Sequence, residues 1–285
     1  MPSLLTRAGI ATLLFLAVPA CANPVTRSIY PAPQAPLTLD GLPAGSRMVP
    51  VTTADGLKLS GILSPGRADR PLLLVFHGNA SSAATALAWL SPLGHDGFRI
   101  LSAEYRGYSG NPGRPSEAGL LADARAFLLA ARAEAAGQPV WVVGHSLGGG
   151  VALALSRTEK LDALVTIGTF SRLRDMAPAL ARGLVPNEYR NREAVEALDE
   201  PLYLIHGSRD GVVPVTHGKA LFEAAAGKQG GAFVLRNADH VPPAADLRPV
   251  FAAIDAAQAN RSLPALPAGT EAHHFARSVG DSSSR

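Results

Sequence analysis

A glycine-rich turn around Ser146 constrains this chain more than any other feature. Residues 144–150 read Gly-His-Ser-Leu-Gly-Gly-Gly, after the apolar run 140–143 and before the small-residue run 151–155. The flanking patterns predict a buried strand that turns at once into a helix. In such a G-x-S-x-G turn the serine is strained at the sheet edge, and its neighbours two positions away have no room for side chains. The pattern therefore predicts that Ser146 is a nucleophile.

Other glycine-rich loops fit this turn less well. A phosphate-binding P-loop is excluded because no Lys-Ser or Lys-Thr pair follows the glycines. A dinucleotide-binding loop is disfavoured because the spacing suits a strand–serine–helix turn better and no suitable acid follows a later strand. A plain turn with an incidental serine is the simplest alternative, and the strand before and the helix after it argue against that alternative.

Strand and helix patterns alternate along the chain. Two short extended runs within 47–63 flank the turn pair Asp55-Gly56, which predicts an antiparallel hairpin. Alternation predicts an α/β fold with a mostly parallel central sheet and helices on both faces, and reactive groups at the carboxyl ends of its strands. The insert 171–200 is long enough for only a small lid or none. Further strands are expected at 71–76, 98–103, 140–143, 161–166, 202–205 and 232–235, with helices at 83–93, 117–134, after Ser146, 216–226 and 247–259.

A serine nucleophile needs a base and an acid that orients the base. His240 follows the last expected strand, and Asp210 follows the strand 202–205, which gives the chain order Ser, Asp, His. Asp239 is the rival carboxylate, but a residue adjacent to the histidine usually points elsewhere. His206 is interpreted as structural from its place on a strand. We therefore expect Asp210 to hold the ring of His240.

Several motifs together resemble a known family. They are His77-Gly78-Asn79, the run Tyr-Arg-Gly-Tyr-Ser-Gly at 105–110, the turn at Ser146, the run 206–210 and Asp239-His240. Over residues 50–258 the chain resembles the α/β-hydrolase superfamily, within the compact serine hydrolases related to fungal Bem46 and to the human ABHD13 and ABHD17 proteins. The resemblance implies an α/β-hydrolase fold with helices around a mostly parallel sheet and a Ser–His–Asp triad.

The oxyanion of an acyl-transfer intermediate needs two backbone N–H donors. Leu147, directly after the serine, is expected to supply one of them. By resemblance to the family, the N–H of Asn79 supplies the other, from the loop after the first parallel strand. A role for the Asn79 side chain stays open. The segment 105–108 either lines the pocket or only packs the loop.

These residues predict an enzyme that transfers an acyl group to water. Carboxylic esters and thioesters are the expected substrates because their leaving groups are good, so the partner is a small-molecule or acylated substrate. No metal or organic cofactor is implied. An acyltransferase or perhydrolase, a peptidase, or a non-catalytic binding lipoprotein are the alternatives. A net charge of +3 without any Lys/Arg-rich run gives no support for nucleic-acid binding.

The N-terminus resembles an export signal. Arg7 precedes the apolar run 8–18, which is too short to span a bilayer, and small residues lead to Cys21, the single cysteine. We interpret 1–20 as a lipoprotein-type signal peptide with a lipid on Cys21, ordinary signal cleavage being the alternative. The protein is thus expected in a bacterial cell envelope, lipid-anchored or else periplasmic or secreted. A Pro-rich tether (21–45), a hydrolase domain (46–260) and a disordered tail (261–285) are expected to follow.

Overall fold

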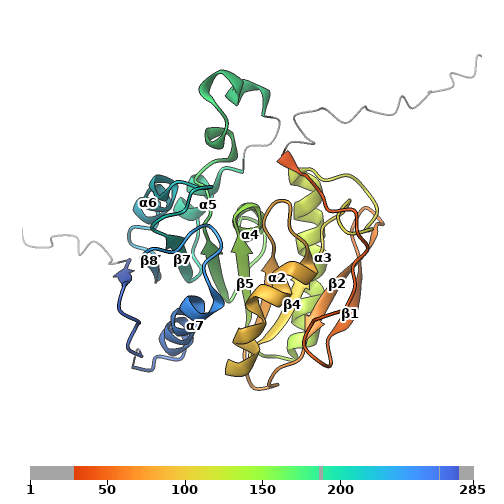
Figure 1. The fold of residues 1–285 in the computed structure, drawn as a ribbon, viewed down its shortest axis with the longest axis horizontal. Helices are drawn as coiled ribbons and strands as arrows, with labels where there is room; N and C mark the ends of the chain where they lie inside the picture. The colour runs from red at the N-terminus through yellow and green to blue at the C-terminus, as the bar shows by residue number, and fades with distance from the viewer. Residues whose placement is uncertain (1–28, 186–188, 263, 276–285) are drawn as a thin grey trace, which may run out of the picture.

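The computed structural model describes residues 29–185, 189–262 and 264–275 (Figure 1). Within these ranges a 9-stranded sheet has the order β1-β2-β4-β3-β5-β6-β7-β8-β9. The strands from β4 to β8 run parallel, whereas β1–β2, β2–β4 and β8–β9 pair antiparallel. The strands are β1 (Arg47–Thr52), β2 (Lys58–Ser64), β3 (Leu72–Phe76), β4 (Arg99–Ala103), β5 (Val140–His145), β6 (Ala163–Ile167), β7 (Leu202–Gly207), β8 (Gly230–Leu235) and β9 (Thr270–His274).

Helices cover both faces of the sheet (Figure 1). On one face pack α3 (Glu117–Ala135), α4 (Leu147–Ser156), α5 (Asn191–Glu196) and α6 (Val215–Ala224). On the other pack α2 (Ala83–Leu90), η1 (Ser91–Asp96) and α7 (Ala244–Gln258). The predicted fold class is confirmed: a mostly parallel sheet between helices, with an antiparallel N-terminal hairpin.

The two cores follow from the alternation of side chains along each buried strand. In β3, Leu72, Leu74 and Phe76 join the core beneath α3 and α4. Leu73 and Val75 join the core beneath α2 and α7. Successive side chains of a strand point to opposite faces, so a strand covered on both sides has to be apolar throughout. This is why β3 appears in the sequence as an unbroken apolar run.

The tail expected to be disordered from residue 261 contains a strand. Residues Thr270–His274 form β9 and pair with β8, and Phe275 after them is buried. The ring centroid of Phe275 lies 5.6 Å from that of Phe222 on α6. The sequence of β9 is polar and lacks apolar alternation, so its order comes from the free edge of β8 and from the contact of Phe275.

The expected tether packs on the domain where it is described. Tyr30 is 4% exposed and its hydroxyl lies 3.3 Å from that of Tyr189. The N–H of Ser109 donates to the carbonyl of Pro33, so this segment is fixed against the loop after β4. The expected signal peptide (1–20) and Cys21 lie outside the described residues. Among the residues that are described, no helix has the length and apolar character needed to cross a membrane.

The insert between β6 and β7 is small. It contains η2 (Leu173–Met176), η3 (Ala179–Leu184) and then α5. Figure 1 shows the η2–η3 part projecting away from the body of the molecule. Leu180 and Leu184 on η3 are both exposed. The η2–η3 part of the insert therefore presents apolar side chains to solvent.

Candidate active site

Ser146 sits at the turn between β5 and α4 with φ +52° and ψ −114°. A positive φ is unfavourable for a residue with a side chain and costs about 1–3 kcal/mol, which the surrounding packing must offset. That packing is tight: a Cβ on Gly144 would lie 2.3 Å from the carbonyl oxygen of Gly148, and one on Gly148 would lie 2.0 Å from that of Phe76. The two glycines thus allow the sharp turn that places the Ser146 side chain at the N-terminus of α4.

His240 and Asp210 meet on the loops that follow β8 and β7. The Nδ1–H of His240 donates to Oδ2 of Asp210 over 2.8 Å. The other carboxylate oxygen of Asp210 accepts from the backbone N–H groups of Val212 and Val213, at 2.9 and 2.7 Å. With the carboxylate held in place and Nδ1 protonated, the Nε2 of His240 is left as a proton acceptor.

The rival carboxylate, Asp239, faces the backbone instead of the ring. Its Oδ1 accepts from the N–H groups of Gly211 and of His240. These two hydrogen bonds lower the pKa of the Asp239 carboxyl. Its role is therefore to hold the two loops together, and the structure brings Asp210, not Asp239, to the imidazole.

The end of β6 joins the nucleophile to the His–Asp pair. The N–H of Ser146 donates to the carbonyl of Ile167 over 2.9 Å. The next residue, Gly168, has φ +56°, and a Cβ there would lie 3.1 Å from Oδ2 of Asp210 and 3.2 Å from Nδ1 of His240. The backbone of Ser146 therefore borders the last residue of β6, and the next residue, Gly168, borders the Asp210–His240 pair.

His145, which the sequence reasoning did not single out, also reaches this site. Its Nε2 donates to the backbone carbonyl of His240 over 2.9 Å, and the two rings are 4.7 Å apart. The ring of Trp89 also packs against the His145 ring, with centroids 5.0 Å apart. Burial, together with the charge of His240, lowers the pKa of the His145 imidazole to about 4. His145 is thus a neutral residue that supports the loop carrying His240. In the sequence, its position next to Ser146 was the signal that could have identified it.

Two backbone N–H groups lie free beside Ser146. Leu147 is the first residue of α4, so no carbonyl of that helix accepts its N–H. A Cβ on Gly78 would lie 3.4 Å from the Cβ of Ser146, so the peptide joining Gly78 to Asn79 borders the serine. Across the described ranges, nothing accepts the N–H of Asn79. The Asn79 side chain is occupied elsewhere: its Oδ1 accepts from the N–H of Ala80 and the hydroxyl of Tyr108.

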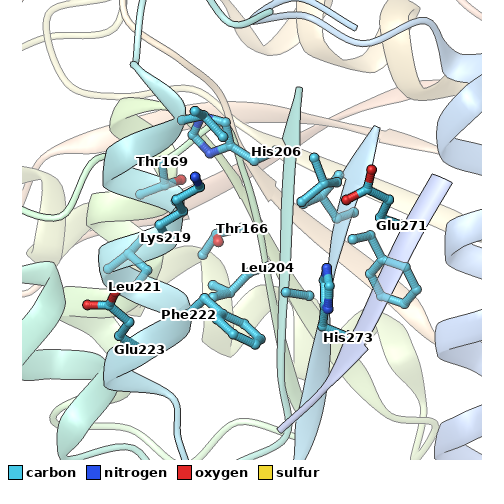
Figure 2. A pocket seen from close by; sticks show the side chains of 16 residues that line it. Thr166, Thr169, Leu204, His206, Lys219, Leu221, Phe222, Glu223, Glu271 and His273 are labelled. Atoms are coloured by element: carbon cyan, nitrogen blue, oxygen red, sulfur yellow. The ribbon is translucent and has the colours of Figure 1, made fainter. Parts of the chain in front are cut away.

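An apolar cavity of about 400 Å³ lies behind the acid (Figure 2). It is bounded by α6 and by β6 to β9, and neither Ser146 nor His240 lines it. His206 lies at its border, where its Nε2 donates to the carbonyl of Val213 and is 3.5 Å from Oδ2 of Asp210. Burial lowers the pKa of His206. The structural role expected for His206 agrees with these contacts, which fix the loop of Asp210.

Comparison with known proteins places these features in a family context. A family model described as alpha/beta hydrolase fold matches residues 71–194. An uncharacterized protein of Mycobacterium tuberculosis is 37% identical over 194 residues, covering 65% of this chain and 69% of that protein. The lysophosphatidylserine lipase ABHD12 of Xenopus tropicalis is 29% identical over 184 residues, covering 55% of this chain and 47% of the lipase. The esterase Pf2001 of Pyrococcus furiosus superposes with a TM-score of 0.59 at 21% identity, covering 81% and 95% of the two chains.

Proposed function

Because the chain belongs to the α/β-hydrolase superfamily, we propose that it hydrolyses carboxylic esters or thioesters through an acyl-enzyme on Ser146. The observation that carries this proposal is the 2.8 Å contact between Nδ1 of His240 and Oδ2 of Asp210, next to a serine at a strained strand–helix turn. Within the superfamily, placement in the compact group related to Bem46 is part of the same proposal and rests on the motifs at 77–79 and 105–110.

The proposed reaction has two steps. The Nε2 of His240 takes the proton of the Ser146 hydroxyl as its oxygen attacks the carbonyl carbon, and Asp210 stabilises the imidazolium that forms. The N–H groups of Leu147 and Asn79 stabilise the oxyanion of the tetrahedral intermediate. The leaving alcohol or thiol takes the proton from His240, and a water activated by the same base then releases the acid and restores the serine.

The proposed substrates include single-chain lipid esters. One relative carries the name of a lysophosphatidylserine lipase. In this chain, Leu180 and Leu184 on the insert expose apolar side chains, which suits contact with an acyl chain or an aggregated lipid. A chain-length series of para-nitrophenyl esters, with an S-acyl thioester beside it, measures the preference directly. Turnover that rises from acetate to octanoate supports a lipid ester, and hydrolysis of amides alone contradicts the proposal.

The direct test of the nucleophile is labelling with a fluorophosphonate probe. Wild type should be labelled, and Ser146→Ala should lose both labelling and ester hydrolysis. Ser156→Ala is the matched control, because Ser156 ends the same helix and its hydroxyl only donates to the carbonyl of Leu153. Equal labelling of wild type and Ser146→Ala would rule out Ser146 as the nucleophile.

We also propose that Cys21 carries a lipid that anchors the protein in the cell envelope. Support comes from the short apolar run 8–18 and the small residues before this single cysteine. An acyl chain contributes about 0.8 kcal/mol of membrane affinity for each buried CH₂ group, so more than one chain gives firm anchoring. Cys21→Ser should move the protein from the membrane fraction to the soluble fraction, and unchanged fractionation contradicts the anchor.

A further inference from the structure

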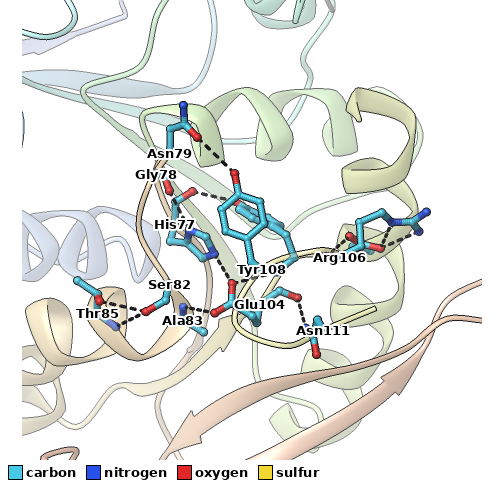
Figure 3. A network of polar contacts seen from close by, with 12 residues as sticks. His77, Gly78, Asn79, Ser82, Ala83, Thr85, Glu104, Arg106, Tyr108 and Asn111 are labelled. Atoms are coloured by element: carbon cyan, nitrogen blue, oxygen red, sulfur yellow. Dashed lines mark hydrogen bonds and ion pairs between the residues drawn. The ribbon is translucent and has the colours of Figure 1, made fainter. Parts of the chain in front are cut away.

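A buried His–Glu pair lies beneath the loop that carries Asn79 (Figure 3). His77 directly follows β3 at the start of this loop, and Glu104 directly follows β4. Both side chains are 0% exposed. The Nε2 of His77 is 2.8 Å from Oε1 of Glu104, and its Nδ1 is 2.8 Å from the carbonyl oxygen of Gly78. The reaction proposed above gives no task to either residue.

The proton on Nδ1 of His77 follows from its partners. The carbonyl oxygen of Gly78 can only accept, so an unprotonated Nδ1 would face it lone pair to lone pair. If Glu104 is ionised, both ring nitrogens carry protons; if Glu104 is protonated, it donates to Nε2 and Nδ1 still carries one. Glu104 also accepts from the N–H groups of Ala83 and Tyr105, so its carboxyl group is held in place by the backbone. In either arrangement, His77 donates from Nδ1 to Gly78.

Two tyrosines hold the ring of His77 in this position. The ring centroids of Tyr105 and Tyr108 lie 4.2 and 5.5 Å from that of His77. The tyrosine rings also contact each other, with centroids 5.5 Å apart, so the three rings form one packed cluster. The Tyr105 hydroxyl also donates to the backbone carbonyl of His77 over 2.9 Å. The imidazole is therefore held by two neighbouring tyrosine rings and by polar contacts at both of its nitrogens.

The bond from His77 acts on the peptide that carries the free N–H. The carbonyl of Gly78 and the N–H of Asn79 belong to one planar peptide unit, so fixing the oxygen fixes the direction of the N–H on its opposite side. A donor at the oxygen also draws electron density from the nitrogen and strengthens the N–H as a donor, by about 10–30% per bond. Both effects matter most when negative charge develops beside Ser146.

We propose that His77, held by Glu104, is a positioning residue that aims and polarises the Gly78–Asn79 peptide toward the oxyanion. This inference rests on the proposed acyl transfer at Ser146. It adds a hydrogen-bond donor, His77, behind the peptide that forms one side of the oxyanion hole. It predicts that the contact of Nδ1 with Gly78 matters for turnover more than the contact of Nε2 with Glu104 does.

Two substitutions separate these contacts. In His77→Asn the amide nitrogen lies near the place of Nδ1 and can still donate to Gly78, whereas in His77→Gln it lies near the place of Nε2 and meets only Glu104. Loss of a full oxyanion donor lowers kcat about 10²–10³-fold. In His77→Gln the N–H of Asn79 remains but is no longer aimed, so we expect part of that loss: a fall in kcat for para-nitrophenyl butyrate of about 10- to 100-fold. In His77→Asn we expect kcat to stay within about threefold of wild type. KM should be unchanged in both.

If His77 serves only the stability of the fold, His77→Asn should be the more damaging variant. It leaves the buried Glu104 without its partner, so it should have the lower Tm and the lower kcat. Wild-type kcat in His77→Gln, or a larger kcat loss in His77→Asn, overturns the proposal. The exposed His95 provides the control pair, His95→Asn and His95→Gln, which should both behave as wild type.

A measurement on the wild-type protein keeps the proposal testable if a variant fails to fold. NMR of protein labelled with ¹⁵N-histidine should show a proton on Nδ1 of His77, and an unprotonated Nδ1 overturns the proposal. The NMR result does not depend on activity. If wild type turns over esters and requires Ser146, while His77→Gln is fully active, the positioning role fails and the hydrolase stands. If wild type neither hydrolyses esters nor labels at Ser146, the proposed function itself fails.

Discussion

Acid should destabilise this fold through His145. Burial lowers the pKa of its imidazole from 6.5 to about 4 in the folded state. Between these two values the unfolded chain binds a proton that the folded chain does not, so the stability from neutral His145 is complete above pH 6.5 and is lost as the pH falls toward 4. At about 1.36 kcal/mol per pH unit, His145 alone removes about 2.5 kcal/mol between pH 7.5 and 4.5.

Urea unfolding followed by circular dichroism at four pH values from 4.5 to 7.5 measures this loss. His145→Gln is the comparison, because its amide nitrogen can still donate to the carbonyl of His240 but does not titrate. Burial also lowers the pKa values of His206 and His217, and their contributions are present in both proteins and cancel in the difference. Wild type should lose about 2.5 kcal/mol more than His145→Gln on acidification. Parallel stability curves for the two proteins would refute the reasoning.

Three further changes test other parts of the structure. Asp210→Asn should keep the fold, by circular dichroism, but lower kcat about 10⁴-fold because the His240 tautomer is wrong; a loss of less than tenfold contradicts the assigned acid. Gly149→Ala should lower stability by about 1–3 kcal/mol in thermal unfolding, because its Cβ would lie 1.8 Å from Oγ1 of Thr169; an unchanged Tm argues against that close contact. Truncation before Thr270 should lower the urea midpoint and promote aggregation, since it bares the edge of β8 and removes Phe275 from α6; a monodisperse protein with the wild-type midpoint contradicts this role for β9.

The sequence predicted an element correctly where its local residue pattern matches the environment that the fold gives it. The fully apolar run of β3 is typical of a strand buried on both faces, which the structure confirms. The glycines around Ser146 predicted a sharp turn, and a side chain at Gly144 or Gly148 would collide with backbone. The chain order also placed Asp210 and His240 on neighbouring strand ends, and the structure brings their side chains together. Their catalytic roles stay predictions for the labelling and kinetic experiments.

What the sequence did not predict depends on contacts between distant segments. The polar residues of β9 resemble a loop until the free edge of β8 is present to pair with them. The His77–Glu104 pair forms because β3 lies beside β4 in the sheet, although α2 separates the two strands along the chain. Tyr30 gave no periodic signal, since its burial depends on contacts with remote segments of the chain, among them the one with Tyr189.

A crystal structure of the protein after reaction with a fluorophosphonate tests the central claim most directly. We expect the phosphorus on Oγ of Ser146, with its oxygen about 2.7–3.1 Å from the N–H nitrogens of both Asn79 and Leu147. The Nε2 of His240 should lie within about 3.2 Å of Oγ or of the leaving-group oxygen. A phosphorus on another residue, or an oxygen that faces solvent away from these two N–H groups, would contradict the account.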